Sequence, residues 1–210
     1  MGVFDRKAVD YDRWYDKYRP AYLSELKAIR AALPKGARGV EIGVGTGRFA
    51  AALGIRIGVE PAAGMAALAR KLDIEVYEAC AEKLPFADGA FDFALMATSL
   101  CFVKNTAAAL REARRVIRPG GRLVLALLDK DSPAGKLYWR RHKAGLFHKG
   151  ARAYGAGTVI ALLKKAGFVK IKTFQTLAAQ PEEVAEPEPV QAGHGAGIFV
   201  VISGTKRRAQ

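Results

Sequence analysis

Apolar residues along the chain alternate between strand-like and helix-like spacing, which is typical of an α/β protein built from repeated strand–helix units. The stretch from Leu123 to Leu128 is apolar at every position, so both of its faces are predicted to be buried. A strand buried on both faces belongs in a parallel sheet that helices cover on each side. Strands are predicted at 40–42, 57–60, 74–78, 91–96, 123–128, 169–174 and 198–203.

Helices are predicted where apolar residues recur three and four positions apart. One begins at Pro20 and ends before Pro34, and a second follows Pro61, which suits a helix start because it lacks an N–H. Asn105 is the predicted N-cap of a third helix, which the Pro-Gly-Gly sequence at 119–121 stops. The predicted apolar faces are Tyr22, Leu26, Ile29 and Leu33; Met65, Leu68, Ala69 and Leu72; and, in a last helix from Thr158 to Gly167, Val159, Leu162, Leu163 and Ala166.

Two segments interrupt this rhythm. Residues 130–157 are basic and aromatic, and connections of that length are usually lids, substrate loops or small inserted helices. Residues 179–197 are rich in Pro, Glu, Gly and Ala and are predicted to form a mobile hairpin loop. We therefore expect a single domain made of an N-terminal helical cap at 1–36, a cofactor-binding core at 37–129, an inserted basic and aromatic cap at 130–157, and a last helix with a C-terminal strand hairpin at 158–210.

The composition fits one folded domain, because 210 residues that are 50% hydrophobic and 26% charged are enough to bury a core. The 34 Lys and Arg residues exceed the 20 Asp and Glu residues, which gives a formal charge of +14. Residues 104–172 hold 17 basic and 3 acidic side chains, so the surplus is local. Such a surplus can attract an acidic small molecule or a nucleic acid, but a solvated surface is the simpler interpretation.

The sequence shows no targeting or membrane signal. Its first ten residues, MGVFDRKAVD, are charged and lack the apolar run of a secretory signal. The longest apolar run, at 123–128, is far shorter than the roughly 20 residues that span a bilayer. Cys80 and Cys101 form neither a disulfide framework nor a CxxC motif. We therefore expect a cytoplasmic protein.

Residues 40–48 read VEIGVGTGR, a glycine-rich turn between a predicted strand and a predicted helix. Gly43, Gly45 and Gly47 lack the side chains that would keep a ligand away from the backbone, and glycine permits a positive φ. Arg48 stands where a dinucleotide-binding motif requires its third glycine, and no Gly-Lys-Ser/Thr sequence ends the turn as in a P-loop. The spacing therefore argues against NAD, FAD and a P-loop nucleotide.

Glu60 closes the next predicted strand, 17 residues after Gly43. Its carboxylate has two acceptor oxygens, which can bind both hydroxyls of a ribose. Ligands of open α/β sheets lie at the carboxyl ends of the strands, where both features are expected. Together they indicate a nucleoside ligand without a pyrophosphate, and a turn that only packs a strand against a helix is the structural alternative.

Between residues 38 and 129 the chain resembles the class I S-adenosylmethionine-dependent methyltransferases, in particular the small UbiE-like (methyltransferase type 11) group. The resemblance rests on several motifs in the family's order: EIGVGTG at 41–47, GVEPAAGM at 58–65, AEKLPF at 81–86, FDFALM at 91–96 and RVIRPGGRLVL at 115–125. It implies a three-layer, Rossmann-like fold with helices on both faces of a seven-stranded, mostly parallel sheet. The implied strand order is 3-2-1-4-5-7-6, with the last strand antiparallel.

The resemblance also implies S-adenosylmethionine as the methyl donor. The glycine turn would contact its methionine part, Glu41 would order the turn and the ammonium group, and Glu60 would bind the ribose. Ala81 and Glu82 would flank the adenine, but Cys80 stands where the family usually has an aspartate that accepts from the adenine amino group. Cys80 is otherwise expected to be a small buried residue. The residues expected at the cofactor are Tyr11, Trp14, Glu41, Gly43, Gly45, Gly47, Glu60, Pro61, Met65, Cys80, Ala81, Glu82 and Ala97.

Tyr11, Trp14, Tyr15 and Tyr18 are spaced so that a helix would carry them on one face. Most such stripes are packing surfaces. In the resembling family, however, the segment before the first strand often folds over the cofactor, and aromatic rings can stabilise a sulfonium as they do other cations. Both interpretations stay open at this point.

No motif names the methyl acceptor. Methyl transfer from a sulfonium mainly requires the nucleophile to be held in line, and a base is needed only if the acceptor keeps its proton at neutral pH. The signatures of amino-methylating and cytosine C5-methylating DNA enzymes are absent after residues 91–96. His142 and His148 have no nearby Cys or carboxylate at ligand spacing, so no metal is expected, although either could act as a base. The acceptor-site candidates are Thr98, Ser99, Tyr138, Trp139, His142 and His148.

Three functions follow from these patterns. The leading one is a methyltransferase that acts on a small molecule. The basic surplus of the chain is compatible with an acidic acceptor. The second is a module that binds the cofactor, its demethylated product or RNA without transferring methyl groups, since interleaved aromatic and basic residues in 130–157 also suit RNA or an anionic lipid surface. The third is a nicotinamide oxidoreductase, which Arg48 disfavours. The sequence gives neither the acceptor nor the oligomeric state.

Overall fold

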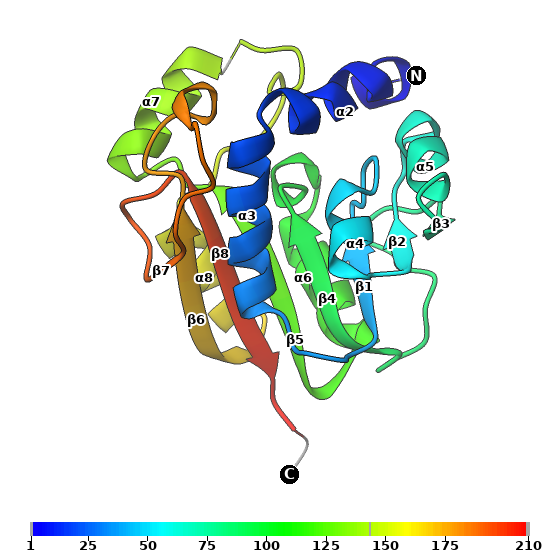
Figure 1. The fold of residues 1–210 in the computed structure, drawn as a ribbon. Coiled ribbons are helices and arrows are strands. Elements are labelled where there is room, and N and C mark those ends of the chain that lie inside the picture. Colours follow the sequence, from blue (N-terminus) through cyan, green and yellow to red (C-terminus); the bar gives the residue numbers. More distant parts are fainter. Residues whose placement is uncertain (1, 143, 209–210) are drawn as a thin grey trace.

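The computed structural model describes residues 2–142 and 144–208 and contains one sheet of eight strands in the order β3-β2-β1-β4-β5-β8-β6-β7 (Figure 1). The first five strands pair in parallel, whereas β8 is antiparallel to both β5 and β6. The strands are β1 Gly39–Ile42, β2 Ile57–Val59, β3 Glu75–Tyr77, β4 Phe91–Ala97, β5 Ile117–Leu128, β6 Phe168–Thr176, β7 Gln191–Ala192 and β8 Phe199–Lys206.

The expected α/β fold and strand order are confirmed, with one addition. The chain returns from β6 through the expected loop at 179–197 and forms the two-residue strand β7, which pairs antiparallel with the outer edge of β6. The last long strand, β8, then inserts between β5 and β6. The sheet therefore has eight strands rather than seven, because the hairpin loop itself contributes a short edge strand.

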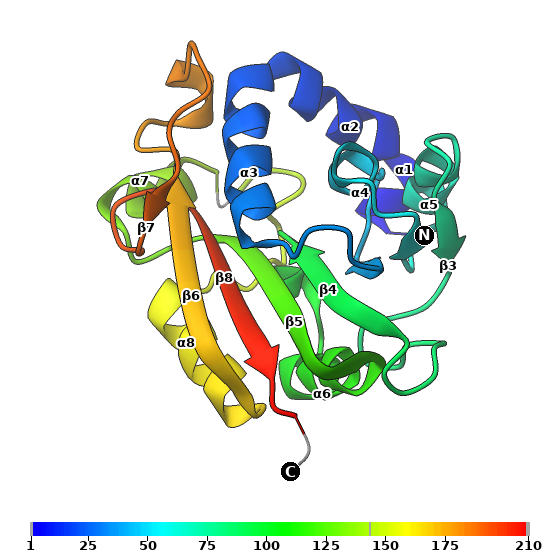
Figure 2. The ribbon, with the colours of Figure 1, turned by 60° about the horizontal axis from the view of Figure 1, so that its bottom comes forward.

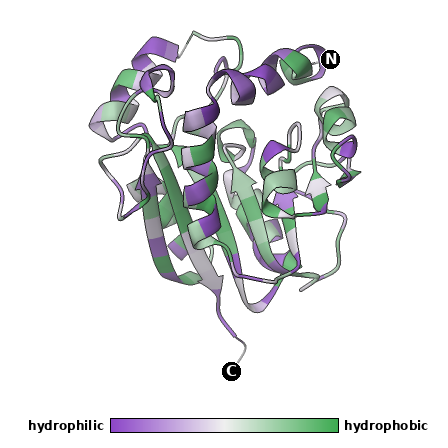
Figure 3. Cartoon of the chain, viewed as in Figure 1, coloured by the Kyte–Doolittle hydropathy of each residue, from purple (hydrophilic) through white to green (hydrophobic). Residues whose placement is uncertain are grey.

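Two layers of helices enclose the sheet (Figures 1 and 2). One core cluster joins α3, α4 and α5 to one face, and the other joins α6 and α8 to the opposite face. Alternate residues of β5 divide between the two clusters, with Val124 on one side and Leu123 and Leu125 on the other. Figure 3 shows the central strands β4 and β5 coloured mostly hydrophobic, as burial on both faces requires. The helices are α1 Val3–Arg6, α2 Ala8–Lys17, α3 Arg19–Ala32, α4 Arg48–Leu53, α5 Ala63–Arg70, α6 Thr106–Val116, α7 Pro133–His142 and α8 Ala156–Lys165, with 3-10 turns η1 Leu100–Phe102 and η2 Pro181–Glu183.

Several helix boundaries differ from the predicted ones. Asn105 is the N-cap of α6, as predicted, and its side chain accepts a hydrogen bond of 3.0 Å from the Ala108 amide. That helix ends at Val116, however, because Ile117 already pairs with Phe91 in β5, so residues 119–121 lie inside the strand. Leu72 is beyond the end of α5 and is 39% exposed, so its predicted burial is wrong.

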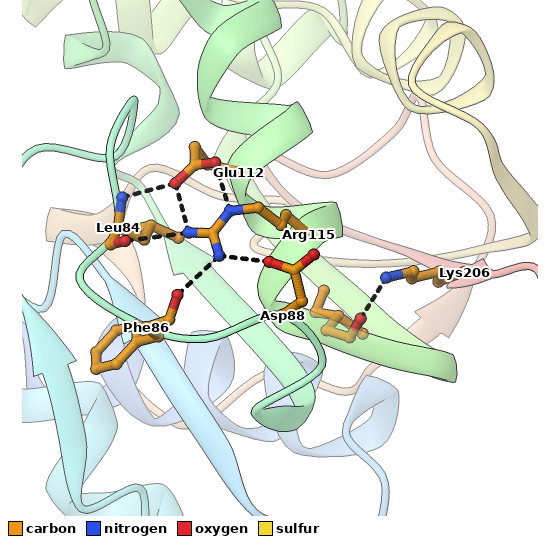
Figure 4. A network of polar contacts seen from close by, with 7 residues as sticks. Leu84, Phe86, Asp88, Glu112, Arg115 and Lys206 are labelled. Atoms are coloured by element: carbon orange, nitrogen blue, oxygen red, sulfur yellow. Dashed lines mark hydrogen bonds and ion pairs between the residues drawn. The ribbon is translucent and has the colours of Figure 1, made fainter.

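A hydrogen-bond network fixes the loop after β3 to α6 (Figure 4). Arg115 donates to the carbonyl oxygens of Leu84 and Phe86 at 3.1 and 2.7 Å, and to the carboxylates of Asp88 and Glu112. Glu112 in turn accepts from the Leu84 amide at 2.8 Å. One guanidinium thus donates to two loop carbonyls and two carboxylates, so it holds the AEKLPF segment against α6. Among the described residues, no helix is long and apolar enough to cross a membrane.

Replacing Arg115 with Met should lower the free energy of unfolding by about 1–3 kcal/mol, because two loop carbonyls and Glu112 lose their charged donor. Denaturant unfolding measures the change. Arg111→Met on the exposed face of the same helix is the matched control and should change stability little. Equal unfolding midpoints for the two variants would contradict a structural role for the network.

Candidate active site

The glycine turn leaves β1 at its carboxyl end and leads into α4. All three of its glycines have positive φ, at 74° for Gly43, 57° for Gly45 and 87° for Gly47. A Cβ on Gly45 would meet only open space, and Gly45 lines a cavity. Its backbone therefore faces the position where a ligand can approach closely.

The other two glycines serve packing. A Cβ on Gly43 would come within 2.5 Å of the Ser99 Cβ, and one on Gly47 within 2.7 Å of the Ile74 Cδ1. Gly43 still lines the cavity, whereas Gly47 is not among its lining residues and lies close to Ala69 of α5 and to Ile74, which precedes β3. The expected contact of Gly47 with the ligand stays a prediction.

Glu60 stands at the end of β2 with its carboxylate directed at the turn. One oxygen accepts from the Gly45 amide at 2.9 Å and the other accepts from the Ala62 amide at 3.0 Å. Burial raises the pKa of this carboxyl group, while the two backbone N–H donors act in the opposite direction. Each oxygen keeps a lone pair, so the carboxylate can also accept from the two hydroxyls of a ribose.

These residues surround a cavity of about 320 Å³ at the carboxyl ends of β1, β2 and β4, here called the donor cavity. Its open floor at Gly45, with the Glu60 carboxylate beside it, fits the sugar and amino-acid parts of S-adenosylmethionine. It brings together most of the residues that the sequence indicated for the cofactor: Tyr11, Gly43, Gly45, Glu60, Pro61, Met65, Cys80, Ala81, Glu82 and Ala97.

Glu41 and Trp14 lie outside the donor cavity. Glu41 is 1% exposed, one of its oxygens has no partner among the described residues, and burial raises its pKa well above the usual range. Its predicted role in ordering the turn and the ammonium group of the ligand stays a prediction. Cys80 lines the donor cavity and is exposed, so its expected burial is wrong.

A second cavity, of about 360 Å³, lies beside the donor cavity and is here called the acceptor cavity. Aromatic side chains are the largest group in its walls, which come from α2, α4, η1, the end of β5, α7 and the segment that follows α7, with Glu25 from α3. Tyr11, Thr98 and Phe102 line both cavities, so the two spaces meet at these side chains. Thr98 follows β4 with φ at 51°, an uncommon conformation for a residue other than glycine. The aromatic lining consists of Tyr11, Trp14, Tyr15, Tyr18, Phe49, Phe102, Tyr138, Trp139, Phe147 and Tyr154.

The expected acceptor-site residues divide between these places. Thr98, Tyr138, Trp139 and His148 line the acceptor cavity. Ser99 instead lines the donor cavity and donates to the Ile42 carbonyl at 2.8 Å, which joins the ends of β4 and β1.

His142 lines neither cavity. Its Nδ1 donates to the Tyr138 carbonyl at 2.9 Å, and its ring stacks on the Tyr138 ring at 4.4 Å. His148, by contrast, has Nε2 3.0 Å from the Tyr138 hydroxyl. His148 lines the acceptor cavity, and burial lowers its pKa, with the neighbouring His142 acting in the same direction.

Helix α2 is both a packing element and a wall of the two cavities. Figures 1 and 2 show it crossing the carboxyl ends of the strands towards α5. Tyr15 packs against Tyr22 and Phe49 and, like Tyr11 and Trp14, lines the acceptor cavity. The guanidinium of Arg48, at the start of α4, donates to the carboxylates of Asp12 and Asp16 and so ties α2 to the end of the glycine turn.

Glu25 is a site residue that the sequence analysis missed. It projects from α3, lines the acceptor cavity and is 3% exposed. No described residue forms a hydrogen bond or ion pair with it, and burial raises its pKa from 4.5 to about 8. The available signal was its spacing, because Glu25 falls within the apolar stripe that contains Tyr22, Leu26 and Ile29.

Comparisons with known proteins agree with this geometry. Residues 40–125 match the methyltransferase domain family. An uncharacterized protein of Methanocaldococcus jannaschii is 43% identical over 206 residues, which cover 98% of this chain and 100% of that protein. A crystal structure from Thermotoga maritima, described as an S-adenosylmethionine-dependent methyltransferase, possible histamine N-methyltransferase, is 47% identical with a TM-score of 0.94 and covers 98% of this chain and 99% of that one. A demethylmenaquinone methyltransferase of Chlorobaculum parvum is 30% identical over 161 residues, or 64% of this chain and 67% of that protein.

The chain belongs to the S-adenosylmethionine-dependent methyltransferases. The expected resemblance to the type 11 group is confirmed, and S-adenosylmethionine is the methyl donor that this family uses.

The Glu25 carboxyl, which has no partner among the described residues, should make stability depend on pH. In the unfolded chain it ionises near pH 4.5, but in the folded chain only near pH 8, so its protonated form stabilises the fold at low pH and that contribution is lost as pH rises through this window. Thermal unfolding of the protein and of Glu25→Gln should give midpoints that diverge between about pH 5 and pH 8, with the variant the more stable. Parallel curves over that window would show that Glu25 has a partner in solution.

Proposed function

We propose that this chain transfers the methyl group of S-adenosylmethionine to a small molecule bound in the acceptor cavity. The observation that carries the proposal is the meeting of the two cavities at Tyr11, Thr98 and Phe102. A donor held at the glycine turn and an acceptor held among the aromatic rings would be in contact there. Much of the catalytic effect in a direct displacement comes from such positioning.

On the donor side, Glu60 would bind the ribose and the Gly45 backbone would contact the methionine part. Ala81 and Glu82 would flank the adenine, with the exposed Cys80 thiol in place of the family's carboxylate. A thiol is a weaker acceptor than a carboxylate, so adenine recognition would depend more on backbone groups and shape. The sulfonium supplies an electrophilic methyl: the acceptor's lone pair bonds to this carbon while the carbon–sulfur pair stays on sulfur, which leaves S-adenosylhomocysteine.

On the acceptor side, the enclosed volume and aromatic walls favour a small molecule over RNA. The aromatic residues of the inserted segment face inward: Tyr138 is 5% exposed, and the Trp139 indole N–H donates to the Leu128 carbonyl at 3.0 Å. They are therefore unavailable as stacking platforms for RNA bases. His148, neutral and next to the Tyr138 hydroxyl, would be able to take a proton from an acceptor that needs to lose one.

Transfer of a labelled methyl group from S-adenosylmethionine tests the proposal directly. The acceptors would be a fractionated metabolite pool and a set of pure amines, alcohols, thiols and carboxylates. Histamine belongs in the set because the Thermotoga maritima relative is described as a possible histamine N-methyltransferase. Labelled product from a small molecule supports the proposal. Cofactor binding without labelling of any small molecule, or labelling of RNA alone, contradicts it.

Glu60→Ala should weaken S-adenosylhomocysteine binding by about 1.5–3 kcal/mol, the magnitude of hydrogen bonds to a charged group. Gly45→Val should abolish binding, because its side chain would fill open space that the ligand needs and would strain a backbone at φ 57°. Isothermal calorimetry measures both effects, and circular dichroism checks the fold.

The matched control is Glu78→Gln, which removes an exposed carboxylate just after the neighbouring strand β3 and leaves the donor cavity unchanged. It should bind S-adenosylhomocysteine like the unmodified protein. A folded Gly45→Val variant with full affinity would show that the ligand lies elsewhere.

A further inference from the structure

The charged side chains around the acceptor cavity fall into two groups. Asp10, Arg13 and Lys17 have other partners: Asp10 pairs with Lys7 and Arg13, and the Lys17 ammonium lies 5.0 Å from the centre of the Tyr18 ring. Glu25 is inside the cavity and has no partner among the described residues. The interior of the cavity therefore offers an acidic group.

An isolated carboxylate in such a place is costly, because its charge has lost water without gaining a donor. The faces of aromatic rings carry negative potential, so the surrounding rings disfavour an anion and attract a cation. Trp14 and Trp139 provide such rings in the same cavity, whereas the Tyr15 ring already has the Arg48 guanidinium 5.9 Å from its centre. A ligand with a positively charged nitrogen would both pair with the buried carboxylate and interact favourably with the ring faces.

We propose that the methyl acceptor is a small organic amine and that Glu25 pairs with its protonated nitrogen inside the aromatic cavity. This inference rests on the proposed function, and it gives the substrate class and a binding residue for it. It differs from the acidic acceptor that the basic surplus of residues 104–172 left open, because none of the described Lys and Arg residues of that range lines the cavity, whereas Glu25 does.

The other titratable groups near Glu25 do not compete for the cation. Burial raises the pKa of the tyrosine hydroxyls around it, so these stay neutral, and it raises the pKa of the Cys101 thiol to about 12. Arg48, on the side of α4, is occupied by Asp12 and Asp16. The described titratable groups that share its cavity or interact with it are Asp10, Tyr11, Arg13, Tyr15 and Lys17 of α2, Tyr18 before α3, Tyr22 of α3, Tyr138 of α7, and Cys101, His148 and Tyr154.

The position of Glu25 also suits delivery of the amine to the donor. Glu25 lines the acceptor cavity together with Tyr11, Thr98 and Phe102, which also line the donor cavity. An amine paired with Glu25 would therefore occupy the cavity that borders the donor cavity. Once the carboxylate has taken the ammonium proton, the free lone pair can bond to the methyl carbon, and the product is a methylated ammonium with S-adenosylhomocysteine.

Matched ligands that differ only in charge test the proposal by calorimetry in the presence of S-adenosylhomocysteine. The first set is 2-phenylethylamine, 2-phenylethanol and phenylacetate, and the second is tyramine with its corresponding alcohol and carboxylate. The amines should bind at least about tenfold tighter than their partners, as expected for a charge-assisted hydrogen bond. At pH 7 each bound amine should release about one proton, since Glu25 and the ammonium hold two protons when apart and share one when paired.

Glu25→Gln keeps the side-chain size but not the charge, so it should weaken amine binding about tenfold or more and remove the proton release and the preference over the alcohols. Glu186→Gln, which removes an exposed carboxylate outside both cavities, is the matched control and should bind the amines like the unmodified protein. Thermal unfolding shows that each variant is folded.

Amine binding that is unchanged in folded Glu25→Gln, tighter binding of the carboxylates or alcohols, or no binding of any amine in the set would each overturn the amine proposal. S-adenosylhomocysteine binding by the unmodified protein separates the two levels. If it persists, the proposed function stands and only the acceptor class is wrong. If it is absent, the proposed function itself fails.

Discussion

The carboxylate of Glu60 fixes the geometry on which the rest of the site depends. It accepts from the Gly45 amide on one side and from the Ala62 amide on the other, so it joins the glycine turn to the start of α5. Two backbone donors offset much of the cost of burying the charge, and the turn is thereby held open around Gly45 before any ligand arrives. The donor cavity is a property of the folded backbone rather than of side chains that must move.

The N-terminal helices supply the walls of the two cavities that the sheet does not provide. Helix α2 lies across the strand ends because Arg48 binds two of its carboxylates, and Tyr11 on that helix then lines both cavities. Arg48 occupies the position that a dinucleotide-binding turn reserves for glycine. The same residue therefore argues against a dinucleotide cofactor and holds α2 in place, so that Tyr11 lies at the border of the two cavities.

Three buried glutamates show how differently one protein can treat the same group. Glu60 accepts from two backbone amides, whereas one Glu41 oxygen has no partner among the described residues. Glu25 faces a cavity and has no partner in the described chain. Burial raises the pKa of all three carboxyl groups, and for Glu25 we propose a ligand cation as the partner.

Local sequence determined the elements and the donor side of the site. Apolar spacing set the strands and helices, Asn105 set a helix start, and the glycine turn and Glu60 were visible because short-range backbone geometry dictates those residue types. Tertiary structure alone decided that Gly47 packs against α5, that Ser99 binds the end of β1, and that Glu25 faces the acceptor cavity. The physical reason is distance along the chain. The acceptor cavity is enclosed by segments from α2 to the region after α7, and the periodicity within one segment does not show which residues of another segment will lie opposite it.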